Sequence, residues 1–165
     1  MAMLSCAFVF SSGCATGPNP PRGYTIQVSL DPSLQGKAVL VDLVGVNPAS
    51  LPRWEASSMT AYWKPGDAMR KDSEPDRVTM DFASGGPLAQ TLKQTDPHWK
   101  EWLAKGATYV LVLADLPGAH TNKPGDSDDR RLKLPLSSTH WAKGTDTISV
   151  RVQQSGIQVT TPTRQ

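Results

Sequence analysis

Cysteine is nearly absent from this sequence. Among 165 residues, the only thiols belong to Cys6 and Cys14. If residues 1–13 are removed as a signal peptide and Cys14 carries a lipid, the remaining chain has no free cysteine. A disulfide framework and a thiolate nucleophile are then both excluded.

A strong charge of one sign and long apolar runs are also missing. The chain holds 17 basic and 15 acidic residues, a formal net charge of +2, and its Lys and Arg positions are scattered. Because no basic patch or stripe stands out, we expect no nucleic-acid partner. The apolar stretch at residues 1–10 is interrupted from Ser11 onward, and a membrane-spanning helix needs about 20 apolar residues.

Few residues are suited to catalysis. Histidine occurs only at His98, His120 and His140, and no two of these have the spacing of a zinc motif such as H-E-x-x-H. A G-x-S-x-G elbow and a phosphate-binding glycine loop are absent as well. We therefore predict a non-catalytic protein with no metal and no cofactor. The rival hypothesis is an enzyme whose site forms where Asp42, His98 and His140 meet in one cleft.

An acidic cluster, "GDSDD", contains Asp126, Asp128 and Asp129. It lacks the remaining acidic ligand and the glycine of an EF-hand calcium loop. The surrounding residues 117–129 are rich in turn-forming types. We interpret the cluster as part of a solvated surface loop rather than as a calcium site.

The N-terminal segment has the layout of an exported lipoprotein. After the apolar residues comes "SSGC" at 11–14, which matches three of the four positions of a lipobox, although the basic residues that usually open a signal are missing. We predict a lipoprotein signal peptide at residues 1–13, a lipidated Cys14 carrying acyl groups such as palmitate, and a Pro- and Gly-rich tether at residues 14–23. The alternative is a cleaved and soluble secreted protein.

The rest of the chain, residues 24–165, is dominated by short strand patterns and is long enough for one domain. Residues 24–30 and 77–82 alternate with period two, as half-buried strands do. Residues 37–46 and 107–116 are apolar on both faces, which is typical of central strands. Further strands are expected at 130–136, where Pro135 indicates a sheet edge, and in a C-terminal hairpin that turns at Ser155-Gly156. This pattern predicts a mainly β, two-sheet β-sandwich of seven to eight strands.

One or two short helices interrupt the strands. Apolar residues from Leu51 to Trp63 recur at helical spacing, and Pro65-Gly66 gives a stop signal. A strand at residues 57–63 is the alternative, because Met59, Ala61 and Trp63 also alternate. A second helix is expected after Asp96, an N-cap candidate followed by Pro97, with Gly106 at its end.

The order of these features carries a resemblance. A signal ending in Gly13-Cys14, the tether, an early strand, Val46-Asn47-Pro48, a helical insert and the strand from Gly106 to Asp115 follow one another before the closing hairpin. This arrangement resembles the small outer-membrane lipoprotein of the type VI secretion system membrane complex. The resemblance implies a transthyretin-like sandwich that Cys14 holds by lipid to the periplasmic face of the bacterial outer membrane. Its implied partner is the periplasmic domain of an inner-membrane secretion component.

The predicted contact surface is the long loop from Gly118 to Asp129, and the second candidate is the helical insert from Trp54 to Asp67. Its candidate residues are Gly118, His120, Asn122, Lys123, Asp126, Asp128, Asp129, Trp54 and Trp63. The alternative function is a periplasmic carbohydrate- or peptidoglycan-binding module, motivated by the five tryptophans Trp54, Trp63, Trp99, Trp102 and Trp141. That alternative requires at least two exposed and coplanar indole rings.

Overall fold

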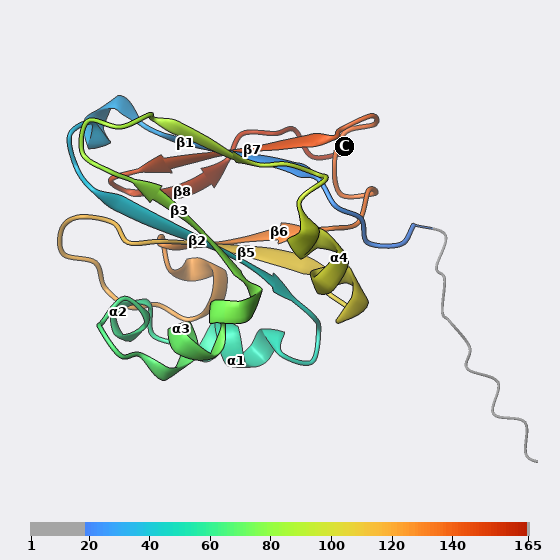
Figure 1. Cartoon of the computed structure of the whole chain (residues 1–165), viewed down its shortest axis with the longest axis horizontal. Coiled ribbons are helices and arrows are strands. Elements are labelled where there is room, and N and C mark those ends of the chain that lie inside the picture. The colour runs from blue at the N-terminus through green and yellow to red at the C-terminus, as the bar shows by residue number, and fades with distance from the viewer. Residues whose placement is uncertain (1–18, 165) are drawn as a thin grey trace, which may run out of the picture.

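The computed structural model describes residues 19–164, so the predicted signal peptide and Cys14 lie outside the described residues. The described chain forms eight strands in two four-stranded sheets that pack face to face (Figure 1). The first sheet has the strand order β4-β1-β7-β8 and the second has the order β3-β2-β5-β6. The mainly β, two-sheet sandwich expected from the sequence is confirmed.

The element bounds follow the sequence patterns closely. The first sheet contains β1 (Thr25–Leu30), β4 (Ala89–Leu92), β7 (Thr147–Gln153) and β8 (Gly156–Val159). The second contains β2 (Val39–Val46), β3 (Arg77–Phe82), β5 (Tyr109–Ala114) and β6 (Arg131–Pro135). The helices are α1 (Leu51–Ala56), α2 (Met59–Tyr62), α3 (Ala68–Asp72) and α4 (Pro97–Ala104), and short 3-10 segments lie at Pro32–Leu34, Glu74–Asp76 and Gly125–Ser127.

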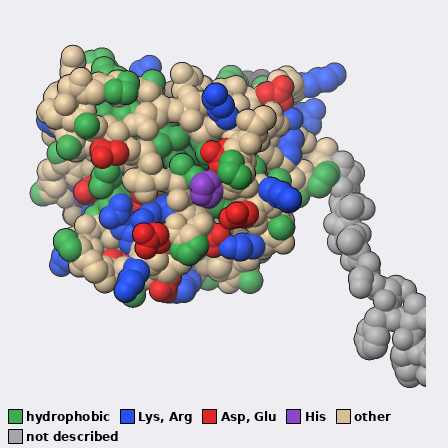
Figure 2. Space-filling view, viewed as in Figure 1, with side chains coloured by type: hydrophobic (Ala, Val, Ile, Leu, Met, Phe, Trp, Pro, Cys, Tyr) green, Lys and Arg blue, Asp and Glu red, His purple; other side chains and the backbone are tan. Residues whose placement is uncertain are grey.

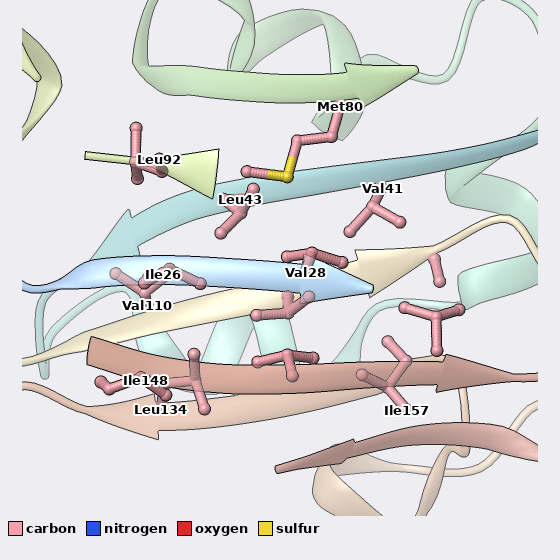
Figure 3. Packing of buried hydrophobic residues seen from close by; sticks show 14 of the residues in the cluster. Ile26, Val28, Val41, Leu43, Met80, Leu92, Val110, Leu134, Ile148 and Ile157 are labelled. Carbon is pink, nitrogen blue, oxygen red and sulfur yellow. The ribbon is translucent and has the colours of Figure 1, made fainter. Parts of the chain in front are cut away.

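The main core fills the space between the two sheets. Alternate residues of β1 point inward, so Ile26 and Val28 are fully buried beside Ile148 of the parallel neighbour β7. They pack against Val41 and Leu43 of β2 in the opposite sheet (Figure 3). The period-two patterning of the sequence therefore places its apolar side chains in one continuous core.

The second sheet is buried on both faces. Its outer face carries Val44, Val46, Leu111 and Leu113, which form a second apolar cluster with residues of the helical insert. Helices α1 to α3 lie on the side of this sheet away from the first one (Figure 1). This cover explains why β2 and β5 are apolar on both faces, and it confirms the prediction that both are central strands.

The insert between β2 and β3 is helical, so the alternative strand at residues 57–63 is wrong. It forms three short helices rather than one. Ser58 caps α2, its Oγ accepting from the backbone N–H of Ala61 at 3.1 Å. Gly66, with φ of +82°, turns the chain toward α3, a conformation that glycine adopts without the steric cost of a side chain.

Helix α4 closes one end of the sandwich, as Figure 1 shows. It begins as expected, because Asp96 Oδ1 accepts from the N–H of His98 at 3.0 Å and Pro97 occupies the first turn. The buried rings of Trp99 and Trp102 contact at 5.1 Å between centroids in an edge-to-face arrangement. Both plug the end of the core.

Three local expectations need correction. Strand β4 was not predicted, because its four residues carry a single buried side chain, Leu92, and pair with β1. The C-terminal hairpin turns at residues 154–155, since Gly156 already pairs with Gln153. The long loop is not wholly solvated, because Asp128 is only 1% exposed.

Candidate functional site

The structure brings the two predicted contact segments together. The backbone N–H of Thr60 in α2 donates to Asn122 Oδ1 in the long loop at 2.9 Å. Figure 1 shows this loop, which follows β5, beside α2. The loop and α2 therefore form one continuous surface at one end of the molecule.

An ion pair beneath this surface holds the loop. Arg130 donates from Nε and Nη2 to the two carboxylate oxygens of Asp128, at 2.9 and 2.8 Å. It also donates to Thr60 Oγ1 at 3.0 Å and to Asn122 Oδ1 at 2.9 Å. Burial alone would raise the pKa of Asp128, but the hydrogen bonds from Arg130 outweigh burial and hold this pKa below its ordinary value. The loop is thus fixed to α2 by a paired and hydrogen-bonded charge.

A pocket lies between α2 and the start of the loop. Its volume is about 310 Å³. Its lining includes Trp63, Asp115, Gly118 and His120, over a floor that contains Met59. Three predicted contact residues, Trp63, Gly118 and His120, therefore meet in one hollow, and Asp115 is a lining residue that the sequence did not single out.

The remaining acidic loop residues face cations. Asp129 pairs with Lys123 at 3.2 Å and Asp126 pairs with Lys133 of β6 at 3.1 Å. All four side chains are at least partly solvent-exposed, so the pairs add little stability. Residues 19–164 contain no group of three or more His, Cys, Asp or Glu arranged to hold a metal ion.

Most of the tryptophans belong to the core. Trp54, Trp99, Trp102 and Trp141 are between 1% and 8% exposed. Trp54 packs against Tyr62 under the helical insert, with 6.0 Å between ring centroids. Only Trp63 is partly exposed among the five. The condition set for the sugar-binding alternative, two exposed and coplanar indoles, is therefore not met by the five tryptophans.

Asp42 is the most buried charged residue of the outer sheet face, with no exposed surface. Its Oδ2 accepts from Tyr62 Oη and Arg70 Nε, both at 2.9 Å, and its Oδ1 accepts from Thr79 Oγ1 at 2.6 Å. Arg77 Nε lies 3.5 Å from the same carboxylate. Asp42 is therefore buried on the outer face of a central strand, and the residue ties β2 to β3, α2 and α3.

The carboxylate of Asp42 raises the pKa values of two neighbours, Tyr62 and Arg70. Burial raises the pKa of Tyr62, and the adjacent carboxylate raises it further, so the phenol stays protonated and donates. Burial lowers the pKa of Arg70, but its hydrogen bond to Asp42 and the charge of that carboxylate act together with Tyr62 to offset burial, and the pKa is raised. The cluster is a structural network of fixed charges.

The three residues of the enzyme hypothesis are not linked. Asp42 is occupied by its four partners beneath the insert, whereas His98 Nδ1 lies 2.7 Å from Asp96 Oδ1 in α4. His140 is exposed and packs edge-on against Trp141 at 4.7 Å between ring centroids. No hydrogen bond within residues 19–164 joins any two of these three side chains. Asp42, His98 and His140 therefore do not form the catalytic cleft that the enzyme hypothesis requires.

No helix in the described part of the chain is long and apolar enough to cross a membrane. No family model and no curated protein matches this chain.

The fold is similar to that of type VI secretion lipoproteins, as two solved structures demonstrate. Serratia marcescens Lip, a membrane-bound component of the type VI secretion system, is 13% identical; the match covers 84% of this chain and 97% of that one, with a TM-score of 0.51. The type VI secretion lipoprotein TssJ1 from Pseudomonas aeruginosa is also 13% identical, over 88% and 98% of the two chains, with a TM-score of 0.50. The resemblance carried by the sequence is therefore confirmed for the fold.

Proposed function

We propose that this protein is a non-catalytic, lipid-anchored component of a secretion-type envelope complex. In this proposal Cys14 fastens the chain to the periplasmic face of the bacterial outer membrane. The sandwich then binds the periplasmic domain of an inner-membrane partner. The observation that carries the proposal is the fold shared with two type VI secretion lipoproteins over nearly their whole lengths.

The N-terminal sequence supports the anchor. Gly13-Cys14 follows an apolar stretch, and a lipoprotein cysteine with three acyl chains binds a bilayer far more strongly than a single chain does. The chain joins the sandwich at Arg22, whose N–H donates to Leu136 O at 3.2 Å and whose guanidinium pairs with Asp146 at 2.9 Å. Arg22 is the eighth residue after Cys14, so the domain would lie within roughly 28 Å of its lipid even if the tether were fully extended.

The arrangement of the molecule supports a partner on the far side from the lipid. The described chain begins at the end where α4 lies, whereas α2 and the long loop lie at the opposite end (Figure 1). Figure 2 shows acidic and basic side chains intermixed over the helical insert, rather than a patch of one sign. A long loop held on a rigid sandwich is a common place for binding residues.

The test is capture of the partner from native membranes by a photo-crosslinking amino acid. Placed at Thr121, which is exposed in the loop, it should cross-link one envelope protein reproducibly. The matched control is the exposed Lys100 of α4, at the other end, which should not give that product. The proposal fails if Thr121 yields no specific product, or if both positions yield the same product.

A further inference from the structure

We propose that the end of the sandwich at which the described chain begins rests on anionic phospholipid headgroups of the membrane that holds Cys14. This entry end is formed by Arg22, residues 93–106 and residues 136–146. Its contacts are the ammonium groups of three lysines, which pair with the phosphates of the headgroups. The inference rests on the proposed function, because it takes the lipid anchor as given and adds which face of the domain meets the membrane.

The start of the described chain is fixed firmly to the entry end. The guanidinium of Arg22 pairs with Asp146 at 2.9 Å. Gly23 O accepts from Gln94 Nε2 at 3.0 Å, and Gly23 lies so close to α4 that a Cβ there would stand 3.0 Å from the Trp99 ring. Because these contacts hold the backbone, the tether leads away from this end and from no other part of the domain.

Three exposed lysines from separate segments lie at the entry end. Lys93 directly follows β4, whose last residue pairs near the start of β1. Lys100 is on α4, and Lys143 lies in the connection from β6 to β7, close in sequence to the Asp146 that pairs with Arg22. Basic side chains are visible on this side of the molecule in Figure 2. The topology thus gathers lysines that are far apart in the sequence.

The entry end carries an excess of positive charge. No ion pair to any of the three lysines occurs within residues 19–164. Among the acidic residues of this end, Asp146 is neutralised by Arg22, and Asp96 accepts the capping bond of α4. Glu101 is exposed on α4 and has no ion pair within the described chain. The three lysines therefore outnumber the two acidic residues, Asp96 and Glu101, that no ion pair to Lys or Arg neutralises.

Distance and charge together select the occupant. A lysine gains free energy near an anionic membrane surface, and this gain falls off within a Debye length. The tether keeps the entry end within roughly 28 Å of the lipid, at an effective concentration on the order of millimolar. Several weak contacts suffice under this condition. A protein partner at the entry end would have to fit within the same short distance, whereas lipid headgroups are already present there.

The test compares two kinds of vesicle that hold the protein through the same atom. The full chain with Cys6→Ser, in which Cys14 is the only thiol, is coupled through that thiol to a maleimide lipid. One set of vesicles contains about 30% phosphatidylglycerol, and the other contains only phosphatidylcholine. A water-soluble acetylating reagent is added, and mass spectrometry gives the reaction rate of each lysine.

The lysines of the entry end should be protected on the anionic vesicles alone. We expect Lys93, Lys100 and Lys143 to react about threefold more slowly there than on the neutral vesicles, because headgroups cover and pair with them. Lys64 and Lys71, which are exposed on the insert, serve as controls in the same molecule and should react equally on both. Equal rates for the entry-end lysines on the two vesicles would overturn the inference.

Charge reversal decides whether the protection is electrostatic. Lys100→Glu should raise the rates of Lys93 and Lys143 on anionic vesicles toward those on neutral ones, whereas the matched Lys64→Glu should leave them slow. Protection that persists in Lys100→Glu, or at about 0.5 M salt, would contradict contact with anionic headgroups.

Failure of this inference is distinguishable from failure of the proposed function, because the coupling supplies the anchor. Equal rates on the coupled protein defeat only the inference. A native protein without lipid on Cys14 would overturn the proposed anchor, and the inference with it.

Discussion

Asp42 occupies a position where an isolated carboxylate would be strongly destabilising. It lies in the middle of an apolar strand with no exposed surface, and two arginines, a tyrosine and a threonine surround it. A buried ion pair of this kind adds little over an apolar contact, but removal of one member leaves the other charge uncompensated. The network therefore serves to fix the helical insert on the sheet.

The first prediction concerns this network. Asp42→Asn should lower the free energy of unfolding by about 3 kcal/mol, because Arg70 and Arg77 would lose their counter-charge. Urea unfolding at neutral pH measures the change. Asp81→Asn is the control, since Asp81 is exposed on the neighbouring strand β3, and should cost less than about 0.5 kcal/mol. Equal effects of the two substitutions would contradict the assigned role of Asp42.

The second prediction concerns pH and Asp128. Its pKa is lowered in the folded protein from an ordinary value of 3.8, so the ionised form stabilises the fold. This stabilisation is complete above the pKa of the unfolded chain and is lost as pH falls through the folded value. Asp128→Asn should therefore be less stable than the unmodified protein at pH 7, and the difference should shrink below about pH 4. Thermal unfolding across this range measures it, and a difference independent of pH would be contrary to the expected linkage.

At the residue scale, the sequence identified several residues of the candidate surface, but it did not predict which charged residues are buried or paired. The loop residues His120 and Asn122 do lie on one surface with Trp63. The burial of Asp42 and Asp128 could not be predicted, because it depends on cover and partners from other elements. Asp115 was missed for the same reason, since the pocket around it forms only when α2 meets the loop.

At the scale of the elements, the position of α4 depends on its close approach to β2 of the second sheet. Trp102 of α4 lies on Gly45 of β2 so closely that a Cβ at residue 45 would stand 2.3 Å from the indole Cγ. Only glycine leaves room for this ring. The helix therefore closes the end of the sandwich because the large Trp102 ring packs directly on the backbone of Gly45.

The third prediction follows from that contact. Gly45→Ala should destabilise the fold by about 2 kcal/mol, because the Trp102 ring or the strand must shift. Gly86→Ala is the comparison, since its Cβ would stand 3.1 Å from Ala83 O, a tight contact that a small shift relieves, and it should have a smaller effect than Gly45→Ala. Chemical unfolding and the near-ultraviolet dichroism of the tryptophans report both the loss of stability and the displaced ring. Unchanged stability in Gly45→Ala would show that the approach is looser than described.

The strands were more predictable than the connections between them. Apolar alternation marks β1 and β3, and apolar character on both faces marks β2 and β5. Strand β4 has only one buried side chain, so its pairing with β1, rather than its own composition, makes it a strand. The insert breaks into three helices because Ser58 and Asp67 each cap a new one, a local signal that helical periodicity alone does not reveal.

Considered as a whole, the molecule buries most of its tryptophans. Four of the five tryptophans are buried in the two apolar clusters of residues 19–164. The outer surface over the insert is instead polar and of mixed charge (Figure 2). With Trp63 as the one partly exposed indole of the five, this surface has no pair of aromatic rings on which a sugar could stack.

The fourth prediction tests this reading of the surface. The purified protein should not cosediment with isolated peptidoglycan above the level of an unrelated control protein. Trp63→Phe, which changes the only partly exposed indole, should leave that low level unchanged. Saturable cosedimentation that Trp63→Phe abolishes would contradict the prediction, because it would show that Trp63 belongs to a sugar-binding site.

The anchor at Cys14 is the claim on which the whole account depends, and an intact-mass measurement tests it most directly. The protein is produced from its native locus, beside Cys14→Ser, and the membrane and soluble fractions are separated. We expect a membrane-bound species that begins at Cys14 and carries the added mass of three acyl chains, and Cys14→Ser should lack that addition. A soluble protein without added lipid mass would contradict the outer-membrane anchor and leave only the shared fold.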